Sequence, residues 1–153
     1  MNIKTIAEEI YNMYHTRDPR EIVNYMDGII VYTNHLDDNI LGLSTVTNNN
    51  LWIIGVNSKI HNSQLIKFVI AHEIGHKVLH DLSSDIFLKR NTLFNLGKLE
   101  NQADEFALNL LYSDEDLKDI LEYVGSELFC EAFKVSHSVF EKVIRERLLK
   151  SEI

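Results

Sequence analysis

The chain has 153 residues, of which 45% are hydrophobic and 25% charged, a composition typical of one soluble globular domain with a buried core. Its 23 acidic side chains outnumber the 15 basic ones and give a formal charge of −8, which disfavours tight binding to nucleic acid. The single cysteine excludes an intramolecular disulfide, and no apolar run approaches the roughly 18 residues that span a bilayer. The N-terminus lacks the pattern of a secretory signal, so we expect a cytoplasmic protein with no membrane segment and one domain over residues 1–153.

Two helices and three strands are predicted in the first third of the chain. Apolar residues recur at helical spacing over residues 3–14, and Asp18-Pro19 is typical of an N-cap and first position of a second helix that ends near Gly28. Short β-branched and aromatic runs then predict strands at residues 28–33, 40–46 and 51–56. The polar turns between these runs favour a small three-stranded antiparallel sheet.

Helices are predicted for the rest of the chain, which gives an α+β fold. The first begins at Asn62 or Ser63, and breaks are expected near residues 81–92, 113, 125 and 136. Ser113, followed by three acidic residues, is a predicted N-cap. Residues 112–153 are expected to pack against the back of the domain; the alternative is a helix-turn-helix with its turn at Val135-Ser136. Because acidic and basic side chains are interleaved there, packing is favoured over DNA binding.

The segment His72-Glu73-Ile74-Gly75-His76 has the His-Glu-x-x-His spacing of zinc peptidases. Residues four apart lie about 40° apart around a helix axis, so His72 and His76 can point two ring nitrogens at one metal ion. Both histidines fall on the apolar face of their helix, where two unpaired imidazoles would be costly without a shared partner. Glu73 is placed to take the proton from a water molecule whose pKa the ion lowers to roughly 7. We predict Zn²⁺ here, with Mn²⁺ or Fe²⁺ less favoured.

A catalytic zinc site needs a third protein ligand and an open fourth position. The helix predicted over residues 96–111 has an apolar face; Glu100 lies inside it and Asp104 at its edge. We therefore predict Glu100 as the third ligand and Asp104 as the acceptor of the other ring N–H of a ligating histidine. The competing interpretation is that Glu100 is a surface residue at the border of the face.

His80 and Cys130 are two further candidates for a role at the site. His80 continues the row of His72 and His76, but three histidines on one helix row fan out too far for one tetrahedral ion. We predict that it supports the ligands, the transition state or the structure rather than binding metal. Cys130 has no histidine at a suggestive spacing and is predicted to be a small buried residue rather than a nucleophile.

These residues resemble the ImmA/IrrE family of HEXXH metallopeptidases. Residues 68–80 (FVIAHEIGHKVLH) look like its F-x-x-A-H-E-x-G-H-x-x-x-H core, and residues 100–111 (ENQADEFALNLL) are similar to its E-x-x-A-[ND]-x-F-A-x-x-LL helix. The family commonly continues with Met-Pro, where this chain has Tyr112-Ser113. The resemblance implies a minimal zincin-like fold, zinc bound by His72, His76 and Glu100, and Glu73 as the catalytic acid/base.

The resemblance also implies a zinc endopeptidase that cuts one cytoplasmic protein, typically a helix-turn-helix repressor of a phage, mobile element or stress response. The alternative is a regulatory protein that sequesters a repressor or antitoxin without cutting it, although the presence of Glu73 argues against this. Zincin-type sites usually bind substrate as an added strand, and we expect the strand at residues 51–56 to be the edge that accepts it. The acidic charge suits a basic, DNA-binding partner, because complementary charge speeds encounter.

Overall fold

The computed structural model describes residues 1–80, 82 and 93–149. The predicted α+β class is confirmed, whereas the break predicted at residues 81–92 falls outside the described residues except for Leu82. In chain order the elements are α1 (Ile3–Tyr14), α2 (Pro19–Tyr25), β1 (Ile29–Thr33), β2 (Gly42–Val46), β3 (Trp52–Asn57), α3 (Ser63–Leu79), α5 (Leu93–Leu111), α6 (Asp114–Tyr123), α7 (Ser126–Phe133), α8 (His137–Ile144) and the π-helical turn η1 (Arg145–Leu149).

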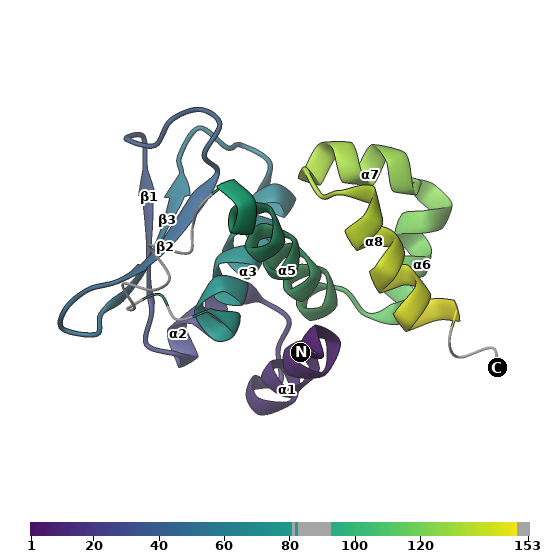
Figure 1. Ribbon diagram of the computed structural model, residues 1–153, viewed down its shortest axis with the longest axis horizontal. Helices are drawn as coiled ribbons and strands as arrows, with labels where there is room; N and C mark the ends of the chain where they lie inside the picture. The colour runs from purple at the N-terminus through teal and green to yellow at the C-terminus, as the bar shows by residue number, and fades with distance from the viewer. Residues whose placement is uncertain (81, 83–92, 150–153) are drawn as a thin grey trace.

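Helices α3 and α5 pack side by side between the sheet and the C-terminal helices (Figure 1). Helix α3 contacts β2 and β3 as well as α5, and α5 also contacts α1 and α8. As a result, residues 103–110 of α5 are all buried, although the sequence pattern predicted a single apolar face. A methyl group on Gly75 of α3 would lie only 3.2 Å from the backbone of Ala103, so the two helices approach closely where they carry the site.

The sheet is mixed, with strand order β1-β3-β2, so the prediction of a purely antiparallel sheet was wrong. Strand β3 pairs parallel with β1 and antiparallel with β2. The prediction that this third strand forms an edge was also wrong, because it lies in the middle. Five of the six residues of β3 are buried, which is typical of a strand covered on both faces. Strand β2 is an edge of this sheet, and it is the strand that contacts α3 most.

Side-chain caps fix where several helices begin. The side chain of Asn62 accepts hydrogen bonds from two backbone N–H groups at the start of α3. Ser113 and Asp116 form a capping box, which confirms the predicted N-cap of α6. Helix α7 ends at Phe133, its C-cap Lys134 has the left-handed conformation (φ 58°), and Ser136 caps α8 two residues later. This tight turn places Phe133, Lys134 and Ser136 on the same cleft as His72 and His76.

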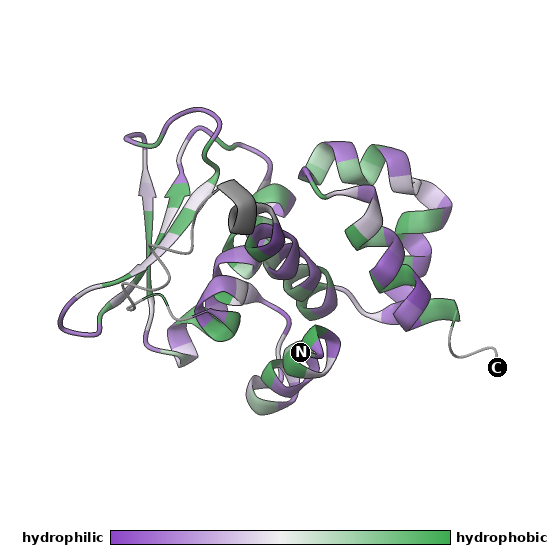
Figure 2. Cartoon of the chain, in the orientation of Figure 1, coloured by the Kyte–Doolittle hydropathy of each residue, from purple (hydrophilic) through white to green (hydrophobic). Residues whose placement is uncertain are grey.

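The C-terminal helices bury apolar residues in the core, and Figure 2 shows hydrophobic and hydrophilic residues mixed along their ribbons. Phe129 and Phe140 pack together in the core, with ring centroids 5.1 Å apart, and Cys130 is buried as predicted. Leu128 departs from the expected packing because 59% of it is exposed. None of the helices in the described ranges is long and apolar enough to cross a bilayer.

Candidate metal centre

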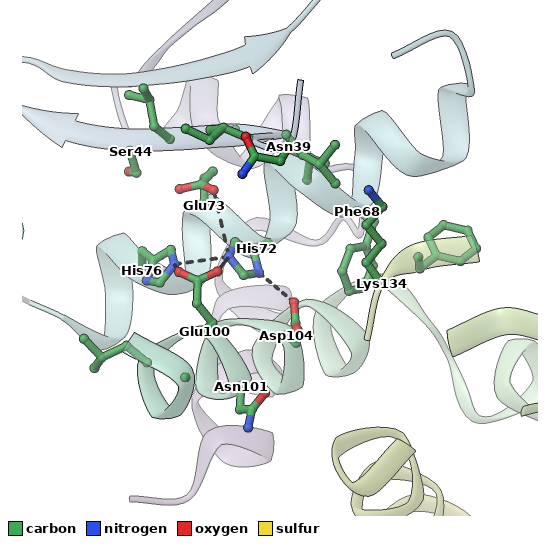
Figure 3. A pocket seen from close by; sticks show the side chains of 18 of the residues that line it. Asn39, Ser44, Phe68, His72, Glu73, His76, Glu100, Asn101, Asp104 and Lys134 are labelled. Atoms are coloured by element: carbon green, nitrogen blue, oxygen red, sulfur yellow. Dashed lines mark hydrogen bonds and ion pairs between the residues drawn. The ribbon is translucent and has the colours of Figure 1, made fainter. Parts of the chain in front are cut away.

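His72 and His76 lie one turn apart on α3 and point into the same space (Figure 3). Their Nε2 atoms are 3.1 Å apart. His76 is buried, and the side chain of His72 is only 13% exposed. The helical spacing of the sequence therefore brings the two rings together, as expected.

Glu100 reaches both histidines from α5. Its Oε2 lies 2.9 Å from Nε2 of His72, and its Oε1 lies 2.9 Å from Nε2 of His76. The structure thus places the carboxylate across the two ring nitrogens rather than leaving it in solvent, although 45% of the side chain is exposed. The three side chains converge on one point, as a ligand set must.

Asp104, one turn further along α5, lies behind His72. The Nδ1–H of His72 donates to Oδ1 of Asp104 over 2.7 Å. With its proton on Nδ1, a neutral His72 has a lone pair on Nε2, the nitrogen that faces Glu100. This is the position predicted for Asp104 from the helix face.

His80 lies outside α3, so the expectation that it continues the helical row was wrong. The helix ends at Leu79, and His80 is its C-cap with an extended backbone (φ −127°, ψ 151°). Its ring nevertheless turns back, and its Nδ1 lies 3.0 Å from Nδ1 of His76. It therefore meets His76 on the side away from Glu100.

Glu73 is buried beside the two histidines, with 4% of its surface exposed. Its Oε2 is 3.9 Å from Nε2 of His72, further than the corresponding oxygen of Glu100. It lies below β2, since a methyl group on Gly42 would be 3.4 Å from the same oxygen. Burial, helped by the nearby carboxylates of Glu100 and Asp104, raises the pKa of Glu73 despite the opposing charges of His72 and His76, which suits a group that accepts and returns a proton.

The charges at the site favour a cation between the three ligand side chains. Burial by itself lowers the pKa of His72, but its hydrogen bonds to Asp104 and Glu100 and the nearby charge of Glu73 outweigh burial and raise this pKa to about 10. Burial opposes ionisation of Glu100, yet its hydrogen bonds to the two histidines bring its pKa below the ordinary value. Surroundings that hold a proton this firmly also favour a metal ion.

The donor set fits zinc. Two imidazole nitrogens and one carboxylate are a ligand set of catalytic zinc sites, and ligand atoms about 2.0–2.1 Å from a tetrahedral ion lie roughly 3.3 Å from one another. The separations of 2.9–3.1 Å between these donors are close to that value and need only a small outward adjustment. The observed geometry therefore fits a divalent cation with room for a fourth ligand.

A cleft of about 650 Å³ opens over this centre. One wall is formed by residues 39–44, at the start of β2, and the far wall by the α7–α8 turn. The second wall was not predicted from the sequence, because helical periodicity does not show which turn folds over a site some 60 residues away. Gln102, whose Oε1 lies 3.0 Å from Nε2 of His80, was not predicted either. Phe133, Lys134 and Ser136 line this far wall, and the ring of Phe68 on α3 packs against that of Phe133, with centroids 5.7 Å apart.

Comparison with known proteins gives a family match over most of the chain. Residues 23–148 match the model of the M78 peptidases, described as the IrrE N-terminal-like domain. An uncharacterised immunity region protein 2 from Bacillus phage phi105 is 32% identical over 112 residues, which cover 73% of this chain and 69% of the phage protein.

A second relative is the metallopeptidase ImmA of Bacillus subtilis strain 168. It is 34% identical over 73 residues, which cover 48% of this chain and 41% of ImmA. The match therefore spans less than half the length of either protein.

Proposed function

Because the chain belongs to the IrrE N-terminal-like family of M78 peptidases, we propose that it is a zinc-dependent endopeptidase. The convergence of two imidazole nitrogens and one carboxylate beside a buried glutamate is the observation that supports this most. His72, His76 and Glu100 would hold the ion. When bound, zinc supplies Lewis acidity, which polarises a carbonyl and lowers the pKa of water.

The proton transfers fall to Glu73. Its buried carboxylate accepts the proton of the attacking water and then donates it to the nitrogen of the leaving amine. The raised pKa of Glu73 favours holding the proton between these two steps. Asp104 keeps the His72 ring oriented, because it accepts the Nδ1–H on the side away from Glu100.

We expect the substrate to bind as an extended strand along β2 rather than β3. Strand β2 is paired only with β3 among the described strands, and residues 41–44 line the cleft directly above Glu73. Gly42 allows β2 to lie this close to α3, since a methyl group at Gly42 would come within 2.6 Å of Cγ1 of Val69. Main-chain hydrogen bonds to β2 would then supply affinity that does not depend on side chains.

Backbone methylation of a substrate peptide tests this mode of binding. Each lost main-chain hydrogen bond costs about 0.5–1.5 kcal/mol, so N-methylation of an amide that pairs with β2 should lower kcat/KM by about two- to tenfold. Adjacent amides of an added strand point in opposite directions, so only every second position should be sensitive. Equal sensitivity at all positions, or none, would contradict strand addition.

As substrate we propose a basic, DNA-binding repressor of the helix-turn-helix type in the cytoplasm. The formal charge of −8 favours encounter with a basic protein. The phage relative is named as an immunity region protein, which supports a role in the control of a phage or mobile element.

Incubation with a purified helix-turn-helix repressor, sought first among the products of the neighbouring genes, tests the proposal. We expect the zinc-loaded protein to produce one defined cut, and mass spectrometry of the fragments to locate it. Generic substrates such as casein should remain largely intact under the same conditions. A repressor that binds the protein but stays whole would instead favour the sequestering function and would refute the peptidase.

A further inference from the structure

The two ring nitrogens of His76 face different neighbours. Nε2 faces His72 and Glu100, whereas Nδ1 lies 3.0 Å from Nδ1 of His80. The other nitrogen of His80, Nε2, lies 3.0 Å from Oε1 of Gln102 on α5. A line of three side chains therefore runs from α5 through the C-cap of α3 to the predicted ligand.

The chemistry of these groups determines where the protons lie. The amide oxygen of Gln102 can only accept, so Nε2–H of His80 donates to it. A neutral imidazole has one N–H, so Nδ1 of His80 is then an acceptor and receives the Nδ1–H of His76. This leaves the lone pair of His76 on Nε2, where a metal ligand needs it.

We propose that Gln102 and His80 are positioning residues that fix the tautomer and ring orientation of His76 for metal binding; this rests on the metal site of the proposed function. A single residue, Asp104, orients His72 in the same way through a hydrogen bond of 2.7 Å. Two residues are needed to orient His76, because His80 lies between His76 and α5. Helix α5 thus provides one ligand, Glu100, the orienting group of His72, Asp104, and the residue that orients His80, Gln102.

The geometry depends on the end of α3. His80 has an extended backbone at the C-cap, and this lets its ring turn back to meet His76 on one side and Gln102 on the other. The hydrogen bond from the His80 backbone N–H to the His76 carbonyl, 3.0 Å long, holds this last turn in place.

Nitrogen NMR of the zinc-loaded protein with labelled histidines tests the proton positions directly. We expect Nε2 of His80 and Nδ1 of His76 to be protonated, and Nδ1 of His80 to be unprotonated. In Gln102→Leu the preference of His80 for this tautomer should be lost. The proposal is overturned if His80 carries its proton on Nδ1 in the unchanged protein, or if Gln102→Leu leaves its tautomer unchanged.

Zinc affinity, measured by competition with a chromophoric chelator, tests the consequence. Loss of an orienting partner typically costs about 10- to 100-fold in metal affinity, and we expect a loss in this range for Gln102→Leu. Gln102→Glu keeps an acceptor for His80 and should bind zinc at least as tightly as the unchanged protein. Lys98→Leu, an exposed position on the same helix, is the matched control and should change nothing. Unchanged affinity in Gln102→Leu would overturn the proposal.

These readouts separate the proposal from the proposed function. Tautomers and zinc affinity are measured without any peptide substrate, so a protein that binds zinc in this way but cuts nothing refutes the peptidase alone. A protein that binds no zinc refutes both. If Gln102→Leu does not fold, the NMR measurement on the unchanged protein still decides the proton positions.

Discussion

The Glu73→Gln variant is expected to retain zinc but to lose peptide cleavage by a factor of about 10²–10⁴, the usual contribution of a general base. Glutamine has nearly the same shape as glutamate, but its amide cannot accept the proton of the attacking water. The carboxylate of Glu73 lies 3.9 Å from Nε2 of His72, further away than that of Glu100, so it is not expected to be needed as a ligand. Initial cleavage rates and metal content of the same preparations measure the two effects.

A second buried glutamate provides the matched control. Glu105 is as buried as Glu73 but faces away from the cleft, where it pairs with Lys142 over 3.0 Å. Glu105→Gln should therefore leave kcat within about twofold, although loss of this partly buried pair should lower the melting temperature. Loss of zinc from Glu73→Gln would make Glu73 a ligand, and normal cleavage by that variant would remove it from the chemistry.

The parts of the site that lie on one helix could be predicted from the sequence. The separation of His72 and His76 follows from helix geometry, because an i, i+4 pair is held on one face by the backbone itself. Glu100 and Asp104 could be placed in the same way, since Glu100 lies inside the apolar face of this helix and Asp104, four residues later, lies at its edge. The structure brings all four side chains together as this periodicity suggested.

The parts that depend on contacts between distant segments could not be predicted. Nothing in the spacing of His80 shows that α3 ends one residue earlier, and nothing marks Gln102 as its partner. The position of the α7–α8 turn over the cleft also depends on contacts between segments far apart in the sequence. Strand order is an intermediate case, because the continuous apolar run of β3 was a signal for a central strand that the polar turns around it obscured.

Replacing Glu100 by alanine is expected to weaken zinc binding by about 100- to 1,000-fold. A zinc site with four protein ligands is worth about 10–16 kcal/mol, so one ligand contributes roughly 2.5–4 kcal/mol. Glu100 bridges both histidines at 2.9 Å, and alanine leaves them without the carboxylate that balances the charge of the ion. Titration with zinc against a chelator of known affinity measures the loss.

The same variant should show the loss in its thermal stability. At free zinc of 1,000 times the dissociation constant, binding stabilises the unchanged protein by about 4 kcal/mol, or about 8–16 °C in Tm for a chain of this size. At the same zinc concentration Glu100→Ala should keep only about 0.4–1.4 kcal/mol. Glu115→Ala, which removes an exposed carboxylate on α6, should keep the full zinc-dependent shift. If Glu100→Ala also keeps it, the third ligand lies elsewhere, and Glu73, whose Oε2 lies 3.9 Å from Nε2 of His72, becomes the residue to replace next.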